Sequence, residues 1–403
     1  MKISIIGQGY VGLPLAIGLS NAHVQTEGIE IDKERYSQLT NKTSPIEDVS
    51  SHEIAKAIDS GFLSFSDRIE SIATSQVVII CVPTPIDNDF QPDLEILDDV
   101  VEKLSEFVSN NTLIISESTS YPGTLRNRIA RRIQETSSAQ GLKFAVAPER
   151  VDPGNIKFNI ANTPRVVGGI DQDSLDQALS IYQKICTEVV PVSSPEVAEF
   201  TKLLENSFRL VNISFINQVA ELAYAAGLDI REIIDAAATK PFGFMPFKPG
   251  IGIGGHCIPV DPMYLTYFAK EHGMNLGLVN EAKMSDIQRT KNIADKICES
   301  SGRSLEILIV GLSYKEGSRD TRESPSVKLM RELRNRGHDV KWRDSKVGEF
   351  ESEKSYCGGL LNFDCVVLVH GDLNLNEDEI SLSKAIFYDA TGQFRHLGKV
   401  IQI

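Results

Sequence analysis

The chain has 403 residues, 41% of them hydrophobic, and this length predicts two or three domains, each large enough to bury its own core. It carries 41 Lys and Arg against 55 Asp and Glu, a formal net charge of -14 with no basic run, so we expect neither a nucleic acid nor a membrane among its partners. No apolar run approaches the roughly 18 residues of a membrane-spanning helix. The run at residues 1–7 is too short for a signal peptide, and the six cysteines form no CxxC pair, which predicts a reducing cytoplasm.

Short β-rich runs alternate with longer segments of helical period through the first half of the chain. These runs are expected to be strands, at residues 2–7, 27–31, 77–82, 112–116 and 144–147. Strands separated by helices predict a parallel sheet with right-handed crossover connections.

The middle of the chain has a different pattern. Between residues 195 and 238 apolar residues recur at helical spacing with almost no Gly or Pro, which predicts a long helix followed by a second one. Residues 240–262 are dense in Pro and Gly and are expected to be mostly irregular, as functional loops often are. A further helix is expected over residues 281–300.

The alternation of strands and helices resumes in the last quarter, which predicts a second, smaller α/β domain. Its strands are expected at residues 307–311, 340–343, 365–369 and 385–388. The predicted fold class is therefore α/β, with two Rossmann-like, doubly wound domains joined by a central domain that contains the long helix. The predicted domains are residues 1–194, 195–300 and 301–403.

A glycine motif, GQGYVG at residues 7–12, follows the first strand and opens a helix. In this context the first glycine makes a tight turn, the second lets the backbone approach a pyrophosphate, and the third permits close packing of helix on sheet. The N-terminus of the helix adds N–H groups for the phosphates. The motif predicts a dinucleotide site formed by Gly7, Gly9, Tyr10, Val11 and Gly12.

Two carboxylates follow the next strand and can select the dinucleotide. Glu30 lies 18 residues beyond Gly12, where a carboxylate can bind both ribose hydroxyls, and Asp32 is its rival two positions on. The spacing does not separate them. Because either carboxylate repels a 2′-phosphate, the cofactor is expected to be NAD rather than NADP, with Arg35 of the same segment in its site.

The segment GIGIGGHCIPVDP at residues 250–262 is the most unusual in the chain. Glycines ahead of Cys257 let the backbone approach a ligand, and the apolar residues 263–268 predict that a helix follows. A Cys near a helix N-terminus is shifted toward the nucleophilic thiolate, which favours a reactive thiol over a buried structural one. Asp261, four residues on, could move a proton for it. No second His or Cys lies at zinc spacing from His256, so no metal site is expected.

The predicted long helix has a polar and an apolar face. The polar stripe contains Lys202, Glu205, Asn206 and Arg209, and the apolar face contains Phe200, Leu203, Leu204 and Leu210. Lys202 and Asn206 are four residues apart, so both can point to one site. A solvated polar face is the alternative.

Seven motifs occur in one order over essentially the whole chain. They are GQGYVGLP at 7–14, CVPTP at 81–85, EST at 117–119, APER at 147–150, the Lys202 and Asn206 pair, GGHCIPVD at 254–261, and GLSYK at 311–315 with DTRESP at 320–325. With these motifs the chain resembles the UDP-glucose/GDP-mannose dehydrogenase family of nucleotide-sugar 6-dehydrogenases. Seven ordered motifs are far more specific than any one of them.

The resemblance implies a four-electron oxidation of a nucleotide-linked hexose, in which the C6 alcohol becomes a carboxylate and two NAD are consumed. A first hydride transfer gives an aldehyde, which Cys257 attacks to form a thiohemiacetal. A second hydride transfer gives a thioester, and water releases the acid. The implied domains are an NAD-binding domain over 1–194, a dimerisation and catalytic domain over 195–300, and a UDP-sugar-binding domain over 301–403.

The resemblance also implies catalytic roles for residues of these motifs. Lys202 would stabilise the oxyanion formed in these steps. Asn206 and Asp261 would hold or activate the water, and Glu149 would assist proton transfer in thioester hydrolysis. Thr119 would position the water or the sugar.

Binding residues are implied in the same way. Pro83, Thr84 and Thr119 would line the NAD site. Lys315, in the GLSYK turn, matches a lysine that contacts phosphate, whereas Arg322 is a weaker candidate that could instead pair with Asp320 or Glu323. The UDP-sugar site as a whole would contain Glu149, Arg150, Lys202, Asn206, Phe247, Lys248, Gly254, Gly255, Lys315 and Arg322.

Departures from the family pattern bear on the substrate. Many UDP-glucose members have an Arg shortly before the catalytic Cys, where this chain has PFG at 241–243, and GGSC where this chain has GGHC. With SYPG at 120–123 and PERVDPG at 148–154, these features resemble the branch that acts on UDP-N-acetylhexosamines. UDP-N-acetylglucosamine is the expected substrate, with UDP-N-acetylmannosamine or UDP-glucose as alternatives.

Two other functions compete with this interpretation. A one-step NAD-dependent hydroxyacid dehydrogenase needs no thiol, and neither does a catalytically silent nucleotide-sugar binder. The joint presence of Cys257, Lys202 and Asp261 therefore argues against both. As in the family, the helix over residues 196–226 is expected to form a homodimer or a higher homo-oligomer, and burial between the domains of one subunit is the alternative.

Overall fold

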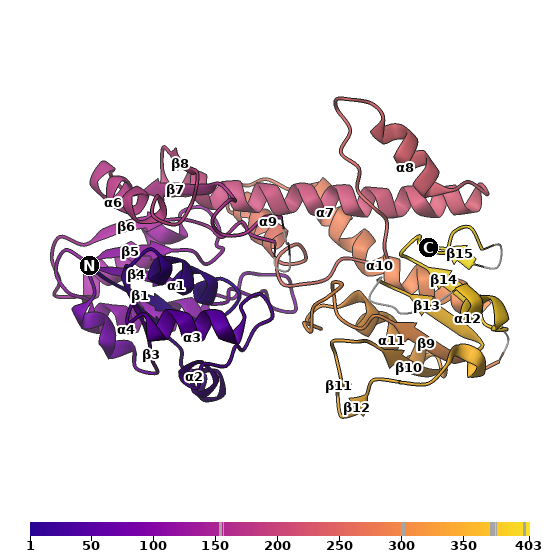
Figure 1. Cartoon of the computed structure of the whole chain (residues 1–403). Coiled ribbons are helices and arrows are strands. Elements are labelled where there is room, and N and C mark those ends of the chain that lie inside the picture. The colour runs from indigo at the N-terminus through magenta and orange to yellow at the C-terminus, as the bar shows by residue number, and fades with distance from the viewer. Residues whose placement is uncertain (153–154, 156, 300–302, 371–374, 376, 398–399) are drawn as a thin grey trace. The chain divides into compact units, whose positions relative to one another are not determined.

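The fold is that of a computed structural model of the chain (Figure 1). The structure describes residues 1–403 except 153–154, 156, 300–302, 371–374, 376 and 398–399. The chain divides into two compact units, one of Met1–Glu205 with Met263–Met274 and one of Asn206–Pro262 with Asn275–Ile403. Each unit is built on one large sheet with helices against it.

The first unit contains an eight-stranded sheet in the order β3-β2-β1-β4-β5-β6-β7-β8. Its strands are β1 (Lys2–Ile6), β2 (Gln25–Ile29), β3 (Leu63–Ser66), β4 (Val77–Ile80), β5 (Leu113–Ser116), β6 (Lys143–Val146), β7 (Arg165–Gly169) and β8 (Val189–Val192). Neighbouring strands are parallel except β6 and β7, which are antiparallel. The first six strands have the Rossmann order, and β1 lies where the strand order reverses.

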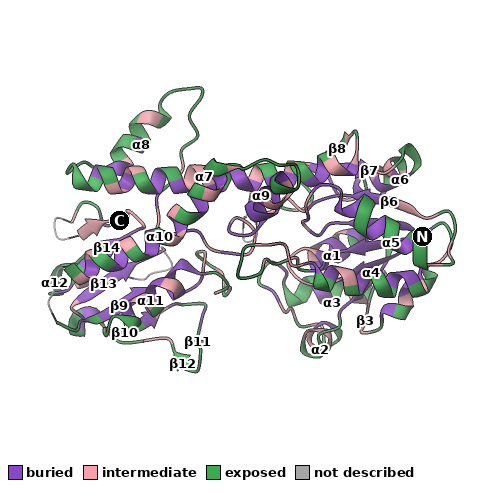
Figure 2. Ribbon diagram, turned by 180° about the vertical axis from the view of Figure 1, so that it is seen from behind, coloured by how far each residue is buried: buried purple, intermediate pink, exposed green. Residues whose placement is uncertain are grey.

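Helices cover this sheet and close its core. They are α1 (Gly12–Asn21), α2 (Lys33–Thr40), α3 (Ser51–Asp59), α4 (Glu95–Phe107), α5 (Arg131–Thr136) and α6 (Gln172–Tyr182), with shorter helical turns η1 (Ile69–Thr74) and η2 (Leu125–Ala130). Consecutive strand residues such as Val78, Ile79 and Ile80, which face opposite sides of the sheet, are fully buried. Burial on both faces is what a parallel sheet covered by helices requires, and Figure 2 shows the middle of this sheet as buried.

The second unit contains a five-stranded parallel sheet in the order β10-β9-β13-β14-β15. Its strands are β9 (Glu306–Val310), β10 (Asp339–Arg343), β13 (Cys365–Leu368), β14 (Ile386–Asp389) and β15 (Val400–Gln402), and β11 (Glu349–Phe350) pairs with β12 (Glu353–Lys354) in a separate hairpin. Its helices include α8 (Ile230–Ala238), α10 (Gly277–Glu299), α11 (Pro325–Asn335), α12 (Glu377–Leu382) and the turn η3 (Leu360–Asn362). Strand β9 lies between β10 and β13, so this sheet also reverses its strand order at its first strand.

The long helix α7 (Pro195–Ala225) has 31 residues and is shared between the two units. It begins with a proline, whose missing N–H has no helical partner at that position, and Gly227, with φ +68°, follows its end. Helix α9 (Asp261–Glu271) comes after the Pro- and Gly-rich stretch. Residues 241–260 contain no helix and no strand, as predicted.

The α/β fold class, the two Rossmann-like sheets and the long central helix are confirmed. The parallel pairing predicted for the strands β1, β2, β4, β5 and β6 is confirmed. Strand β7, which was not predicted, enters antiparallel, and the described part of the connection from β6 to β7 contains no crossover helix. Strands β3, β7, β8, β11, β12 and β15 were not predicted. Helix α10 ends at Glu299, and Ser300, the predicted end, lies outside the described residues, as does the domain boundary placed there.

Among the described residues, no helix combines the length and the apolar character needed to cross a membrane.

Candidate active site

The glycine turn after β1 is tightly enclosed at two of its three glycines. Gly7 has φ +89°, and a Cβ there would lie 2.6 Å from the carbonyl oxygen of Cys81. A Cβ on Gly12 would lie 1.9 Å from the Gly7 carbonyl oxygen, so a side chain would push α1 away from the turn. A Cβ on Gly9 would meet no atom within 4 Å. The turn is thus open at Gly9, where a pyrophosphate needs room, and these residues fit a dinucleotide.

The two candidate ribose carboxylates have different roles in the fold. Glu30 is buried, and its carboxylate accepts the Gln8 N–H at 3.1 Å and the Asp32 N–H at 3.0 Å. Asp32 is exposed, and its side chain caps α2 by accepting the Arg35 N–H at 2.8 Å. The Arg35 guanidinium lies 3.3 Å from Glu30. Glu30 therefore ties the glycine turn to the end of β2, and the choice of ribose ligand stays a prediction.

The remaining predicted cofactor residues follow the carboxyl ends of β1, β4 and β5. Tyr10, Val11, Thr84 and Thr119 are half-buried, and Pro83 is exposed. In a doubly wound sheet the carboxyl ends of neighbouring strands lie along one edge, and that edge is where ligands bind. The structure thus brings the predicted cofactor residues to the same edge of the first sheet.

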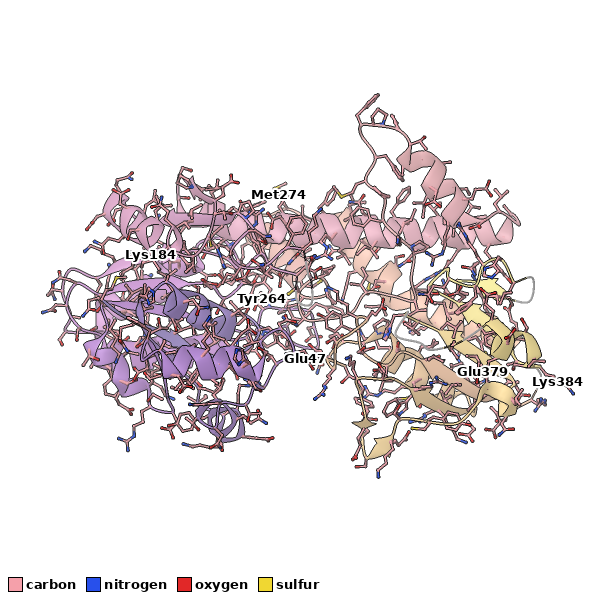
Figure 3. All side chains as sticks on the ribbon, in the orientation of Figure 1. Glu47, Lys184, Tyr264, Met274, Glu379 and Lys384 are labelled. Atoms are coloured by element: carbon pink, nitrogen blue, oxygen red, sulfur yellow. The ribbon has the colours of Figure 1, made fainter. Side chains whose placement is uncertain are left out.

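Side chains of the first unit hold the loops that carry these residues. Tyr264, labelled in Figure 3, belongs to α9. Its hydroxyl donates to the Pro85 carbonyl at 2.9 Å, just beyond Thr84. The Ser118 hydroxyl donates to the Val82 carbonyl at 2.8 Å and so joins the loop after β5 to the loop after β4.

Glu149 belongs to a buried ionic network in the first unit. The Arg165 guanidinium donates to Glu149 at 2.7 Å and to Glu117 at 3.0 Å, and the Tyr182 hydroxyl donates to Glu117 at 2.6 Å. The other Glu149 oxygen accepts the Val151 N–H at 2.6 Å. The orientation of Glu149 is therefore fixed through both of its oxygens.

Glu117 and Glu149 share the Arg165 guanidinium in this network, and the pKa of Glu117 is raised whereas that of Glu149 is lowered. Burial raises the pKa of Glu117 to about 7, although Arg165 opposes that shift. At Glu149 burial also favours the protonated form, but Arg165, the Val151 N–H and Lys202 outweigh it, so the pKa of Glu149 lies below its ordinary value. Glu149 is thus the ionised carboxylate, which can accept a proton from water.

Burial along α7 does not follow its polar and apolar faces, and the alternative of a solvated polar face is wrong for Lys202 and Asn206. Lys202 and Asn206 are 8% and 5% exposed, whereas Leu204 is 56% exposed and Phe200 is also exposed. Leu203 and Leu210, assigned to the apolar face, are fully buried. The buried polar residues are tolerated because charged or hydrogen-bonding groups face them, as at Glu149 for Lys202.

Arg150 is placed by the same helix. Its guanidinium donates to Glu205 of α7, with 3.2 Å between Nε and a carboxylate oxygen, and to the Pro164 carbonyl at 2.7 Å. Arg150 therefore has an intramolecular ion pair in addition to its predicted role in substrate binding.

The Cys257 turn lies in the second unit. The Asp261 N–H donates to the Cys257 carbonyl at 2.8 Å, so the four-residue spacing is one helical turn, as predicted. The Asn206 amide donates to the Asp261 carboxylate at 2.6 Å, and both side chains are buried. The Cys257 thiol is partly exposed. The structure thus brings Asn206 and Asp261 together next to the candidate nucleophile.

The glycines ahead of Cys257 are required by packing inside the second unit. A Cβ on Gly254 would lie 2.7 Å from Tyr314 Cβ and 2.9 Å from Pro325 Cδ. Gly255 has φ +83°, and a Cβ there would lie 2.9 Å from the Tyr314 ring. Close approach of the loop to protein is therefore one reason for these glycines, besides the predicted approach to a ligand.

Phe247 and Lys248 lie earlier in the same irregular stretch. The Phe247 ring packs edge-on against Phe208 of α7, with 5.9 Å between ring centroids, and Lys248 is exposed.

The predicted phosphate residues follow β9. Lys315 is half-buried, and its backbone carbonyl accepts a hydrogen bond from the Ser313 hydroxyl at 2.9 Å. Arg322 donates to Asp320 through Nε at 2.9 Å and through a terminal nitrogen at 2.6 Å. Arg322 therefore forms the ion pair with Asp320 that was the alternative to binding phosphate.

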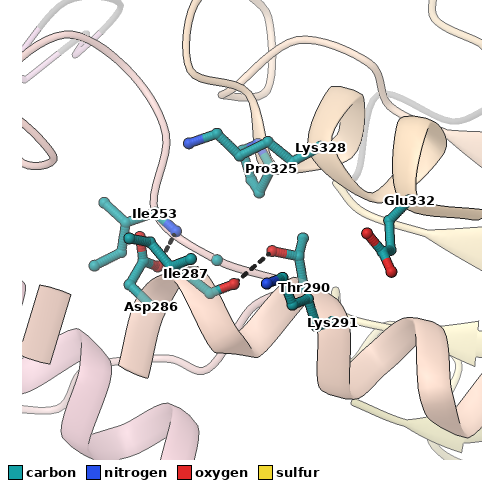
Figure 4. A pocket seen from close by; sticks show the side chains of 9 residues that line it. Ile253, Asp286, Ile287, Thr290, Lys291, Pro325, Lys328 and Glu332 are labelled. Atoms are coloured by element: carbon teal, nitrogen blue, oxygen red, sulfur yellow. Dashed lines mark hydrogen bonds between the residues drawn. The ribbon is translucent and has the colours of Figure 1, made fainter. Parts of the chain in front are cut away.

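A pocket of about 230 Å³ lies in the second unit behind the glycine-rich loop (Figure 4). Its lining includes Gly252 and Ile253 of the loop, Asp286 and Lys291 of α10, and Lys328 of α11. This volume is below that of typical sites for drug-sized ligands.

Sequence reasoning missed three buried charged residues that organise the first unit. They are Glu117, Arg165 and Glu199. Glu199 of α7 accepts the Gly123 N–H at 2.6 Å and the Leu125 N–H at 2.9 Å, and burial raises its pKa to about 8. A single arginine in the apolar run RVVGG was the available signal for Arg165, because a buried charge needs a partner.

Comparison with known proteins gives matches over most of the chain. Models of the UDP-glucose/GDP-mannose dehydrogenase family match in three parts: its NAD binding domain at residues 1–186, its central domain at 196–287 and its UDP binding domain at 308–395. A UDP-N-acetyl-D-mannosamine dehydrogenase of Pyrococcus horikoshii is 33% identical over 86% of this chain and 84% of its own. A UDP-N-acetyl-D-glucosamine 6-dehydrogenase of Pseudomonas aeruginosa is 31% identical over 83% of this chain and 80% of its own.

Solved structures show the same fold. The UDP-D-ManNAc dehydrogenase structure from Pyrococcus horikoshii matches with a TM-score of 0.91 at 28% identity, over 100% of this chain and 99% of that one. A UDP-glucose dehydrogenase from Pyrobaculum islandicum matches with a TM-score of 0.88 at 22% identity, over 100% of this chain and 96% of that one, which is a likeness of fold alone.

Proposed function

Because the chain belongs to the UDP-glucose/GDP-mannose dehydrogenase family, we propose that it oxidises the C6 hydroxyl of a UDP-N-acetylhexosamine to the carboxylate with NAD. The observation that carries this proposal is the Cys257 turn, where a partly exposed thiol lies one helical turn ahead of Asp261, whose carboxylate accepts a hydrogen bond from Asn206 of α7. A one-step hydroxyacid dehydrogenase has no use for that thiol.

The glycine turn and the acidic end of β2 would hold the cofactor. Gly7 and Gly12 allow the tight turn, Gly9 leaves room for a pyrophosphate, and Glu30 or Asp32 would bind ribose hydroxyls and repel a 2′-phosphate. When bound, NAD accepts one hydride from the C6 carbon in each of the two oxidations.

Cys257 would make the second oxidation possible. Its sulfur adds to the C6 aldehyde to give a thiohemiacetal, and loss of hydride from that carbon gives a thioester. The buried ammonium of Lys202 would stabilise the oxyanions of these steps. Overall, one alcohol and one water yield one carboxylate, two hydrides to NAD and three protons.

Hydrolysis of the thioester needs a held water and a base. Asn206 and Asp261 would hold the water, and Thr119 would help to position it or the sugar. Glu149 would assist transfer of its proton: Arg165 and the Val151 N–H, opposing the effect of burial, lower the pKa of that carboxylate and so keep it ionised, the form that can accept a proton. Attack of the water restores the Cys257 thiol and releases the acid.

The diphosphate would be bound by cations of the second unit. Lys315 is the first candidate. Arg322 would have to share its guanidinium with Asp320, to which it is paired. Placement of local cations is needed because a net charge of -14 does not attract an anionic substrate.

Two C2 epimers are candidate substrates. The sequence favours UDP-N-acetylglucosamine, and the relative at 33% identity carries the name of a UDP-N-acetyl-D-mannosamine dehydrogenase. We would assay UDP-N-acetylglucosamine, UDP-N-acetylmannosamine and UDP-glucose for NADH formed per acid. A ratio near two with one acetylated sugar supports the proposal. A clear preference for UDP-glucose would refute the branch assignment, and a ratio near one would refute the two-step reaction.

We also propose that the protein is a cytoplasmic homodimer or higher homo-oligomer formed through α7. Phe208, Phe215 and Leu222 recur at seven-residue intervals on this helix and are 45%, 61% and 69% exposed. An exposed apolar row of this kind favours a partner surface. Light scattering should give at least twice the monomer mass, and Phe215→Glu should reduce it, whereas a monomeric wild type would contradict the proposal.

A further inference from the structure

We propose that three buried charged residues of α10 are positioning residues that hold the loop carrying Cys257. Lys283, Asp286 and Arg289 recur at three-residue intervals, so they lie along one side of the helix. They are only 6%, 6% and 2% exposed. The inference rests on the proposed function, because it concerns the nucleophile of that reaction.

Two of these contacts bracket the candidate nucleophile. The Asp286 carboxylate accepts the Ile253 N–H at 2.7 Å, four residues before Cys257 (Figure 4). The Lys283 ammonium donates to the Pro259 carbonyl at 3.2 Å, two residues after it. The backbone is thus fixed on both sides of the thiol by charged side chains of a single helix.

Arg289 fixes the beginning of the loop. Its Nε donates to the Gly250 carbonyl at 3.0 Å, and a terminal nitrogen donates to Glu221 of α7 at 2.8 Å. The Gly250 N–H in turn donates to the Asn217 side chain, also on α7, at 2.9 Å. Both polar groups of this glycine therefore have partners on helices of the second unit.

The composition of the loop explains why charged side chains form the hydrogen bonds to its backbone. Irregular, glycine-rich backbone has no ladder of hydrogen bonds, and buried N–H and C=O groups must find partners elsewhere. Hydrogen bonds to charged groups are the stronger kind. Burial raises the pKa of Asp286 and lowers that of Lys283, so keeping both charged groups inside has a cost that ordinary packing would avoid.

The position of the thiol matters for only part of the reaction. Oxidation of the alcohol to the aldehyde does not use Cys257, whereas oxidation of the aldehyde does. Displacing a reacting group by about 1 Å can cost about 100-fold in rate. Loosening the loop should therefore slow the second oxidation selectively.

The test compares Asp286→Ala with Asp286→Asn, whose amide oxygen can still accept the Ile253 N–H. The two oxidations are measured separately, one as NADH from the UDP-N-acetylhexosamine with the aldehyde trapped by hydroxylamine, the other as NADH from the UDP-sugar 6-aldehyde. We expect Asp286→Ala to lower kcat for the aldehyde about 100-fold, with less than about a threefold change for the alcohol. Asp286→Asn should recover most of the loss. Lys283→Met, which keeps the apolar stem, should slow oxidation of the aldehyde in the same way as Asp286→Ala. It replaces Asp286→Ala in the test if that variant fails to fold.

Controls separate positioning from general damage. Glu281→Ala removes an exposed charge from the same helix and should leave both rates unchanged. Equal loss of both oxidations in Asp286→Ala and Lys283→Met, or no loss in either, would overturn the inference. Cys257→Ser is run alongside: if it still oxidises the aldehyde at the wild-type rate, the proposed function fails instead.

Discussion

The two sheets begin with the same junction and continue differently. At the end of β1, Gly7 has φ +89°, and Glu30, just after β2, accepts the N–H of the residue that follows Gly7 at 3.1 Å. At the end of β9, Gly311 has φ +99°, and Asp344, just after β10, accepts the N–H of the residue that follows Gly311 at 2.8 Å. In both places a carboxylate beyond the second strand fixes the turn beyond the first.

The segments after the two turns differ in length. Helix α1 begins at Gly12, five residues after Gly7, whereas α11 begins at Pro325, 14 residues after Gly311. Only the first junction therefore places a helix N-terminus directly after its strand, which is the arrangement that binds a pyrophosphate. The second junction inserts the turn of Lys315. The shared junction is therefore structural, and we expect the segment after it to determine which ligand is bound.

The largest expected effect is that of Gly12→Ala. The added methyl would lie 1.9 Å from the Gly7 carbonyl oxygen, which is backbone and cannot swing away. We expect the free energy of unfolding to fall by about 3 kcal/mol, at the upper end of overpacking costs. Urea unfolding measures this. Wild-type stability would contradict the close packing of α1 on the turn.

Gly311→Ala should have a somewhat smaller effect at the second junction. The positive φ strains any other residue, and the methyl would lie 2.7 Å from the His370 ring, which can move. We expect a loss of about 2 kcal/mol in the free energy of unfolding. The KM for NAD should not change. A higher KM for NAD would place the second junction in the cofactor site and contradict its purely structural role.

Gly9→Ala should separate ligand from packing. The methyl would meet no protein atom within 4 Å, so stability should change by less than about 0.5 kcal/mol. If the pyrophosphate lies there, affinity for NAD should fall about tenfold, or about 1.4 kcal/mol. Urea unfolding measures the stability, and calorimetric titration with NAD measures the affinity. Unchanged affinity would remove the reason for assigning the open glycine to the cofactor.

Asp344→Asn should have the smallest effect and depend on pH. Burial would raise the pKa of Asp344, but the N–H groups of Val347, Ser313, Lys346 and Leu312 outweigh it, so the pKa lies below the usual 3.8. A depressed pKa adds stability above pH 3.8, and that stability is lost as pH falls through the native value. The variant should thus be about 1 kcal/mol less stable at pH 7, with a smaller difference at pH 3. A difference independent of pH would contradict this charge assignment.

Local parts of the site could be predicted from the sequence. The GQGYVG turn and the spacing from Cys257 to Asp261 involve neighbours in the chain, so motif and helical period suffice. The pairs from Arg165 to Glu149 and Glu117 join residues 16 and 48 positions apart. They depend on β7 entering the sheet antiparallel, which no periodicity signals.

Helix α7 shows a second limit of prediction from the sequence. The rule that apolar residues face inward fails there, because Lys202 and Asn206 are buried while Leu204 and Phe208 are exposed. A helix that buries polar side chains and exposes a row of apolar ones inverts the usual pattern. The sequence alone contains both faces but does not say which one the fold covers.

The central claim is that the Cys257 sulfur carries the substrate between the two oxidations. The most direct measurement is peptide mass spectrometry of Glu149→Gln, a variant expected to hydrolyse the thioester slowly, after incubation with NAD and a UDP-N-acetylhexosamine and an acid quench. The account predicts that the peptide containing Cys257 gains the mass of the UDP-sugar acyl group, with two NADH formed per modified thiol. Steady release of acid and two NADH per sugar while Cys257 stays unmodified, or an acyl group on another cysteine, would contradict it.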